Sequence, residues 1–74
     1  MISPGKGVTV DGVEYLCFED GEIDGKSYLC LITVEEPNEV CFAEQKEVDG
    51  KLQIRIVGGR DEKMKVIEGL KREA

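Results

Sequence analysis

The dipeptide Asp-Gly follows a β-branched residue at three places in this chain, in Val10-Asp11-Gly12, Ile23-Asp24-Gly25 and Val48-Asp49-Gly50. A strand-like run follows each of them. Asp-Gly between such runs indicates a two-residue β-hairpin, because a type I′ turn needs positive φ at both central residues. The sequence therefore predicts a sheet of antiparallel hairpins. The uneven spacing of the three copies indicates recurrent turn chemistry and not a solenoid repeat.

A fourth dipeptide, Asp20-Gly21, competes with Asp24-Gly25 for the same chain reversal. The sequence does not decide which of the two makes the hairpin turn. If the turn is at Asp24-Gly25, a regular ladder would place Cys17 and Cys30 on one face of neighbouring strands.

The hairpin around Asp49-Gly50 allows a register to be predicted. Val48 would face Lys51, and Glu44 would face Arg55 as an exposed ion pair. The residues expected on the apolar face are Cys41, Ala43, Leu52, Ile54 and Ile56. Such a separation of apolar and polar faces is typical of a half-buried antiparallel pair.

Residues 26–34 are apolar on both faces, which predicts a central strand. Residues 13–18 would pair with it, and the acidic, proline-containing link 35–39 would lead into the strand that begins at Val40. Residues 1–7 are expected to be flexible.

The pattern changes after Gly58-Gly59, where a helix over residues 61–72 is expected, with Asp61 as its cap. Met64, Ile67 and Leu70 have helical spacing on its apolar face, and Val66 is adjacent to it. The sequence therefore predicts one α+β domain over residues 1–74. An antiparallel meander of four to five strands over residues 8–57 would be followed by one amphipathic helix packed on one face.

Charge divides the chain into two parts. Residues 1–50 have three lysines against twelve acidic residues, whereas residues 51–74 have seven basic and four acidic residues. Nucleic-acid binding needs a basic surface, and anionic membranes also attract basic segments. We therefore expect neither partner. No apolar run is long enough for a spanning helix and no signal peptide is recognised, so a cytoplasmic protein is expected.

The chain contains no histidine, the commonest general base and metal ligand near neutral pH. Cys17, Cys30 and Cys41 are expected to be buried apolar residues, because no Cys-x-x-Cys spacing exists and three thiolates without histidine make an incomplete zinc set. We predict that the protein is not an enzyme, and we expect no catalytic, cofactor-binding or metal-binding residues.

Two further segments resemble known ligand-binding motifs only in part. Asp20, Glu22 and Asp24 match the first half of a calcium loop, but Leu31 occupies the position of the bidentate glutamate. Residues 58–61 lack the spacing of a phosphate-binding loop, so they are interpreted as a strand-to-helix joint.

From about residue 20 to residue 70, the chain resembles the YrzB-like family of small acidic bacterial proteins of unknown function. The resemblance lies in the segment Ile23-Asp24-Gly25-Lys26-Ser27-Tyr28-Leu29-Cys30-Leu31, followed in order by the acidic link, the strand at residues 40–44, the Asp49-Gly50 hairpin and the short helix. The resemblance implies a bacterial cytoplasmic protein and supplies no catalytic residues.

The leading hypothesis is a small non-enzymatic interaction or regulatory module that binds a protein partner or a second copy of itself. Its basis is the thin core expected of a short chain with two-sided apolar strands and exposed edge strands. The alternative hypothesis is an acidic mimic of nucleic acid that occupies the basic site of a DNA- or RNA-binding protein. The mimic would need carboxylates in a spaced row along one face.

Overall fold

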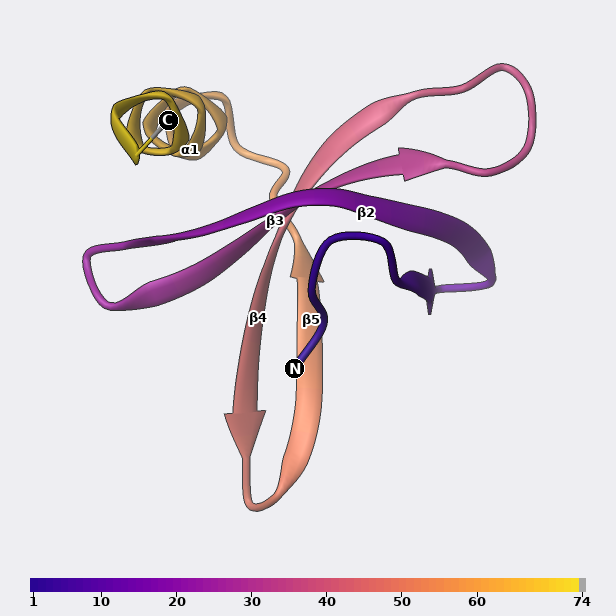
Figure 1. The fold of residues 1–74 in the computed structure, drawn as a ribbon, viewed down its shortest axis with the longest axis horizontal. Coiled ribbons are helices and arrows are strands. Elements are labelled where there is room, and N and C mark those ends of the chain that lie inside the picture. Colours follow the sequence, from indigo (N-terminus) through magenta and orange to yellow (C-terminus); the bar gives the residue numbers. More distant parts are fainter. Residues whose placement is uncertain (74) are drawn as a thin grey trace.

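The computed structural model describes residues 1–73 and the side chains of residues 1–71. The elements are β1 (Gly7–Val10), β2 (Val13–Ile23), β3 (Lys26–Thr33), β4 (Val40–Val48), β5 (Lys51–Ile56) and α1 (Arg60–Glu73). The strands form one antiparallel sheet in the order β1-β2-β3-β4-β5, and α1 lies beside it (Figure 1). The α+β class and the antiparallel meander followed by one helix are therefore confirmed.

Three Asp-Gly dipeptides make the tight turns of the sheet. Asp11, Asp24 and Asp49 have φ of 50°, 52° and 52°, and the glycine after each has φ of 80°, 77° and 76°. Positive φ at both positions is the mark of a type I′ turn, whose twist matches that of the flanking strands. Asp24-Gly25 thus makes the second hairpin, while Asp20-Gly21 lies inside β2.

The hairpin of β4 and β5 has the predicted register. Val48 is opposite Lys51, Glu44 is opposite Arg55, and Ala43 is opposite Ile56. The predicted central strand also has its expected place, since β3 pairs with β2 on one side and β4 on the other.

The pairing of β2 with β3 contains a β-bulge that the sequence pattern does not indicate. Cys17 is opposite Leu31 and Glu19 is opposite Cys30, so Phe18 is an extra residue in β2. Because side chains alternate between faces, one extra residue reverses the face of everything beyond it. The expectation that Cys17 and Cys30 share a face is wrong for this reason.

The sheet has apolar clusters on both faces. One cluster joins the helix to the sheet and consists of Tyr28, Cys30, Val57, Val66 and Leu70, with Ile23 and Phe42 packed against it. The other, on the opposite face, consists of Cys17, Leu29, Leu31 and Ala43, with Ile2, Val8, Tyr15, Cys41, Ile54 and Ile56 packed against it. Neighbouring residues of β3 thus belong to different clusters, as its two-sided apolar pattern indicates.

The N-terminal segment covers part of the second cluster. The Ile2 backbone N–H donates to Oε1 of Gln45 at 2.8 Å, and Nε2 of Gln45 donates to the Ile2 carbonyl at 3.0 Å. Nε2 also donates to Oγ of Ser27 at 3.1 Å, so the buried Gln45 amide has its partners. Residues 1–7, expected to be flexible, therefore contact the sheet at both ends, since Gly7 already belongs to β1.

Helix α1 begins one residue earlier than predicted. The carbonyl of Gly59 accepts a hydrogen bond from the backbone N–H of Lys63 at 3.0 Å, so Gly59 occupies the cap position. Asp61 lies inside the first turn together with Glu62, and its assignment as the cap is wrong. Its negative charge still favours the helix there, because the N-terminal end of the helix dipole is positive.

The side of α1 that meets the sheet includes only part of the predicted apolar face. Val66 and Leu70 are buried, whereas Met64 and Ile67 are exposed. Gly69 lies on the buried side with Val66 and Leu70, because a Cβ at this position would lie 2.4 Å from Cδ1 of Ile23. The absence of a side chain at Gly69 lets the helix approach the end of β2 closely.

Candidate functional site

The residues on the helix-facing side of the sheet form rows that run across the strands. One row contains Glu19 of β2, Cys30 of β3 and Phe42 of β4, which extends to Val57 through a hydrogen bond from the Val57 N–H to the Phe42 carbonyl. Val66 and Leu70 of α1 pack on this row.

The next row lies beyond the helix. Leu16, Ile32 and Val40 are opposite one another across β2, β3 and β4. Leu16 and Val40 are 43% and 57% exposed, although both are large apolar residues. The single helix thus covers one part of this face and leaves an apolar part of it in solvent.

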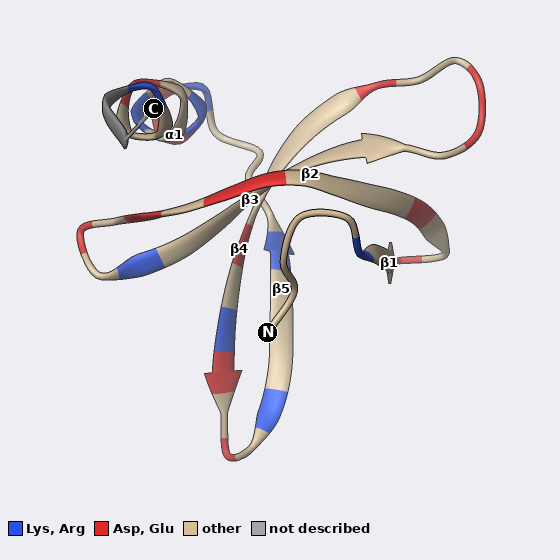
Figure 2. Cartoon of the chain, viewed as in Figure 1, with Lys and Arg blue, Asp and Glu red and all other residues tan. Residues whose placement is uncertain are grey.

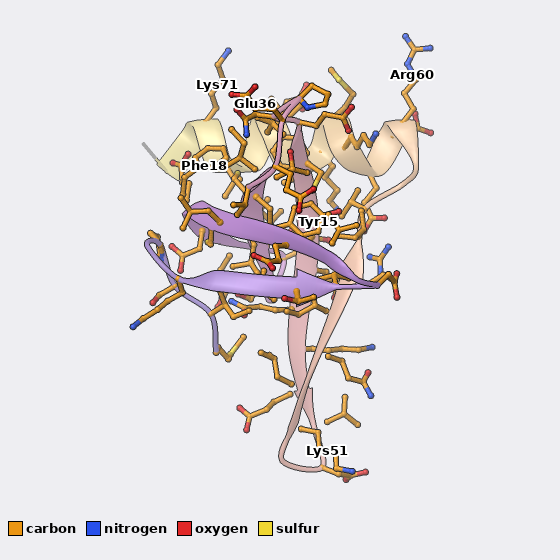
Figure 3. All side chains as sticks on the ribbon, turned by 90° about the vertical axis from the view of Figure 1, so that its right-hand side faces the viewer. Tyr15, Phe18, Glu36, Lys51, Arg60 and Lys71 are labelled. Carbon is orange, nitrogen blue, oxygen red and sulfur yellow. The ribbon has the colours of Figure 1, made fainter. Side chains whose placement is uncertain are left out.

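An open groove of about 300 Å³ lies where α1 meets this uncovered part. It is lined by Phe18, Glu19, Cys30, Val40, Phe42, Ile67, Leu70 and Lys71. We call this feature the apolar groove. Phe18 and Lys71 both lie near the C-terminal end of α1 (Figure 3).

The bulge in β2 is what places Phe18 at the apolar groove. Glu19 is opposite Cys30 and shares its face. In a regular strand consecutive side chains point to opposite faces, so Phe18 would then point to the other face. In the structure both residues line the groove, and Phe18 is 47% exposed. The only sequence signal is the run Leu16-Cys17-Phe18, which breaks the alternation of polar and apolar residues.

The connection between β3 and β4 fixes the start of β4 beside the groove. Nδ2 of Asn38 donates to the Thr33 carbonyl at 2.8 Å, and the Glu39 backbone N–H donates to Oγ1 of Thr33 at 2.8 Å. These bonds hold the segment that leads directly into Val40, so the exposure of Val40 belongs to an ordered part of the chain.

An arginine joins α1 to the sheet at the other end of the helix. Nη2 of Arg55 lies 2.7 Å from Oε1 of Glu44 and 2.6 Å from Oε2 of Glu62. The hydrogen bond from Arg55 lowers the pKa of the Glu62 carboxyl. The predicted cross-strand pair of Glu44 and Arg55 is therefore confirmed, and Glu62 adds a link from the helix that the sequence did not indicate.

The cysteines are free thiols in apolar surroundings. Cys17 and Cys30 are buried and Cys41 is half-buried. Burial raises the pKa of all three thiols, that of Cys30 to about 11. A raised pKa leaves little thiolate near neutral pH, which is the opposite of an activated nucleophile. Cys17 and Cys41 lie with the cluster on one face of the sheet and Cys30 on the other.

The acidic residues of the half-matched calcium motif do not converge in one place. Asp20 and Glu22 lie on β2, while Asp24 lies in the turn, where Nζ of Lys65 is 2.8 Å from its Oδ2. That hydrogen bond lowers the pKa of Asp24. Among the described residues, no three cysteine, aspartate or glutamate side chains gather so that they could hold a metal ion.

Comparison of the chain with protein-family models, with curated proteins and with solved structures finds no match. The resemblance to the YrzB-like family therefore stays a prediction. Within residues 1–73, no helix combines the length and apolar character that crossing a membrane requires.

Proposed function

We propose that this protein is a non-enzymatic interaction module that docks on a protein surface through the apolar groove and the uncovered row beside it. The observation that carries the proposal is the exposure of Leu16, Phe18 and Val40 on one side of the sheet. Large apolar side chains that adjoin one another in solvent are typical of protein–protein contacts. The bacterial origin and the cytoplasmic location are further parts of this proposal.

The chemistry of the described residues supports binding over catalysis. The chain has no histidine, and its thiol pKa values are raised by burial. The side chains that line the apolar groove are aliphatic or aromatic apart from Cys30, Glu19 and Lys71. Such a mainly apolar lining can bury apolar surface of a partner.

The distribution of acidic residues favours the interaction module over the nucleic-acid mimic. Asp and Glu lie in the middle of β2, in the β3–β4 connection, on β4 and in the hairpin turns, which are at separate ends of the molecule (Figure 2). A mimic of a phosphate backbone would need a continuous row of such residues. The dispersed charges are what solubility of a small acidic domain requires.

A capture experiment with matched variants tests the proposal. The protein, Val40→Asp and Leu52→Asp would each be used to capture partners from cells that produce the protein, with the captured proteins quantified by mass spectrometry. Leu52 is a suitable control, because it is also exposed but lies on β5 away from the apolar groove. We expect Val40→Asp to lose the specific partner and Leu52→Asp to keep it. A partner captured equally by both variants would refute the role of the groove.

A further inference from the structure

The apolar groove offers both a projecting side chain and a hollow. Phe18 has no residue opposite it on β3 and stands at the rim, half in solvent. Beside it, Val40, Phe42 and Ile67 border the open space. Phe18 lines the wall of its own groove without filling it. An aromatic residue in this situation is a natural anchor for a contact, since aromatic side chains supply much of the binding energy of interfaces.

A surface with these two features can pair with an identical surface. In a two-fold symmetric contact, the same patch faces itself, so each projection must meet a hollow of the second copy. A two-fold axis that passes between Phe18 and the other residues of the apolar groove brings Phe18 of each copy into the groove of the other. The uncovered row of Leu16, Ile32 and Val40 then extends the contact on both sides.

The charges at the rim satisfy the same symmetry. Glu19 and Lys71 line the groove and have opposite signs. Among the described side chains, neither of them forms an ion pair. A two-fold axis at the groove would place Glu19 of one copy toward Lys71 of the other, at two equivalent contacts. A rim of a single sign would instead repel a second copy.

We propose that the occupant of the apolar groove is a second copy of this chain, in a symmetric dimer with reciprocal Phe18 insertion and two Glu19–Lys71 contacts between copies. This inference rests on the proposed function, because it names the partner of the same surface.

Charge-reversal variants test the reciprocity directly. In a dimer of Glu19→Lys, both contacts become repulsions between lysines, and in a dimer of Lys71→Glu both become repulsions between glutamates. A mixed dimer of the two variants has an attractive pair at both contacts. We expect each variant alone to dimerise at least about tenfold more weakly than the original protein. Their equimolar mixture should recover the original dimerisation constant.

The measurement is sedimentation equilibrium over a range of concentrations, with circular dichroism to show that every variant is folded. Phe18→Ser should abolish the dimer independently of charge, whereas the control Leu52→Asp should leave it intact. A protein that is monomeric at all concentrations, or a mixture that associates no better than its components, overturns the inference.

The two proposals fail in distinguishable ways. A monomeric protein that still captures a different partner, and loses it on Val40→Asp, refutes the symmetric dimer and leaves the interaction module standing. A monomer whose captured proteins are unaffected by Val40→Asp refutes both. Both proposals are supported if Phe18→Ser abolishes the dimer and the mixture of Glu19→Lys with Lys71→Glu dimerises like the original protein.

Discussion

Gly69 determines how closely α1 approaches the sheet. A Cβ there would lie 2.4 Å from Cδ1 and 2.6 Å from Cγ1 of Ile23, well inside van der Waals contact. Alanine normally stabilises a helix interior by about 1 kcal/mol relative to glycine, whereas forced overpacking costs about 1–3 kcal/mol. We expect the clash to dominate, so that Gly69→Ala lowers the free energy of unfolding by about 1–2 kcal/mol in urea denaturation.

A second background separates the clash from other effects of this substitution. Ile23→Ala removes the atoms that the new Cβ would meet. In that background, Gly69→Ala should raise the free energy of unfolding through its better helix propensity. The same sign of effect in both backgrounds would contradict the close approach of α1 to Ile23. Glu68→Ala, on the exposed side of the helix, serves as the neutral control.

The buried thiol of Cys30 makes stability depend on alkaline pH. Its side chain is buried beneath α1, and burial raises the pKa from 9.0 to about 11. Between these values the folded state keeps a proton that the unfolded state releases, so stability falls as pH rises. The contribution is complete below pH 9 and is lost as pH passes through about 11.

The expected loss from Cys30 over this range is on the order of 2 kcal/mol. Urea denaturation from pH 8 upward would measure it, and Cys30→Ala should flatten the pH dependence. The decline should not vanish, because burial also raises the pKa of Cys17 and Tyr28. An identical slope in Cys30→Ala and the original protein would show that Cys30 does not titrate in this range.

At the scale of elements, the hairpin turns at Asp11-Gly12 and Asp49-Gly50 were predictable because their information is local, whereas the choice between Asp20-Gly21 and Asp24-Gly25 was open. Asp11-Gly12, Asp24-Gly25 and Asp49-Gly50 each contain the residue types that a type I′ turn requires. Given the last of these turns, alternation fixed the register of β4 and β5 without knowledge of the rest of the fold.

The features that build the apolar groove depend on contacts between elements distant in sequence. The bulge at Phe18 interrupts the pairing of β2 with β3, and no residue type near it in the sequence indicates a bulge. On α1, Gly69 lies against Ile23, while Ile67 is exposed although its spacing suits an apolar helix face. The competing principle was tertiary packing, which overrides periodicity when a small residue permits close contact.

The side chain of Gln45 attaches the start of the N-terminal segment to the sheet, while backbone hydrogen bonds from Gly5 and to Lys6 join its later part to Cys17 of β2. Gln45 exchanges two hydrogen bonds with the Ile2 backbone, as a neighbouring strand would, and Ile2 packs on the cluster around Leu31. Gln45→Leu keeps the approximate size but leaves the Ile2 groups without partners. We expect a loss of about 1–3 kcal/mol in the free energy of unfolding.

Hydrogen exchange followed by NMR separates this attachment from general destabilisation. The Ile2 amide should exchange much faster in Gln45→Leu. The exchange rates of the β3 amides should change only as far as the free energy of global unfolding changes. Gln53→Leu, on the exposed face of β5, is the matched control and should leave the Ile2 amide unchanged. An Ile2 amide that is equally protected in Gln45→Leu would contradict the role of the Gln45 amide.

For the whole molecule, β3 connects two apolar clusters that lie on opposite faces of one sheet. Leu31 belongs to one cluster and Cys30 to the other, and they are adjacent in the chain. A domain of this length has a total stability of about 4–11 kcal/mol by the usual range per residue. Loss of either cluster therefore removes a large part of the free energy of unfolding. We expect the domain to unfold as one cooperative unit.

The two tyrosines allow this cooperativity to be tested, since Tyr28 lies in the cluster under α1 and Tyr15 packs on the other. Fluorescence of Tyr15→Phe then reports on Tyr28 alone, and that of Tyr28→Phe on Tyr15 alone, because the chain has no tryptophan. We expect Leu31→Ala to cost about 2–5 kcal/mol and to shift the urea midpoint by the same amount in both backgrounds. If Leu31→Ala shifts the midpoint seen by Tyr15 and leaves that seen by Tyr28 in place, the two faces unfold independently and β3 does not couple them.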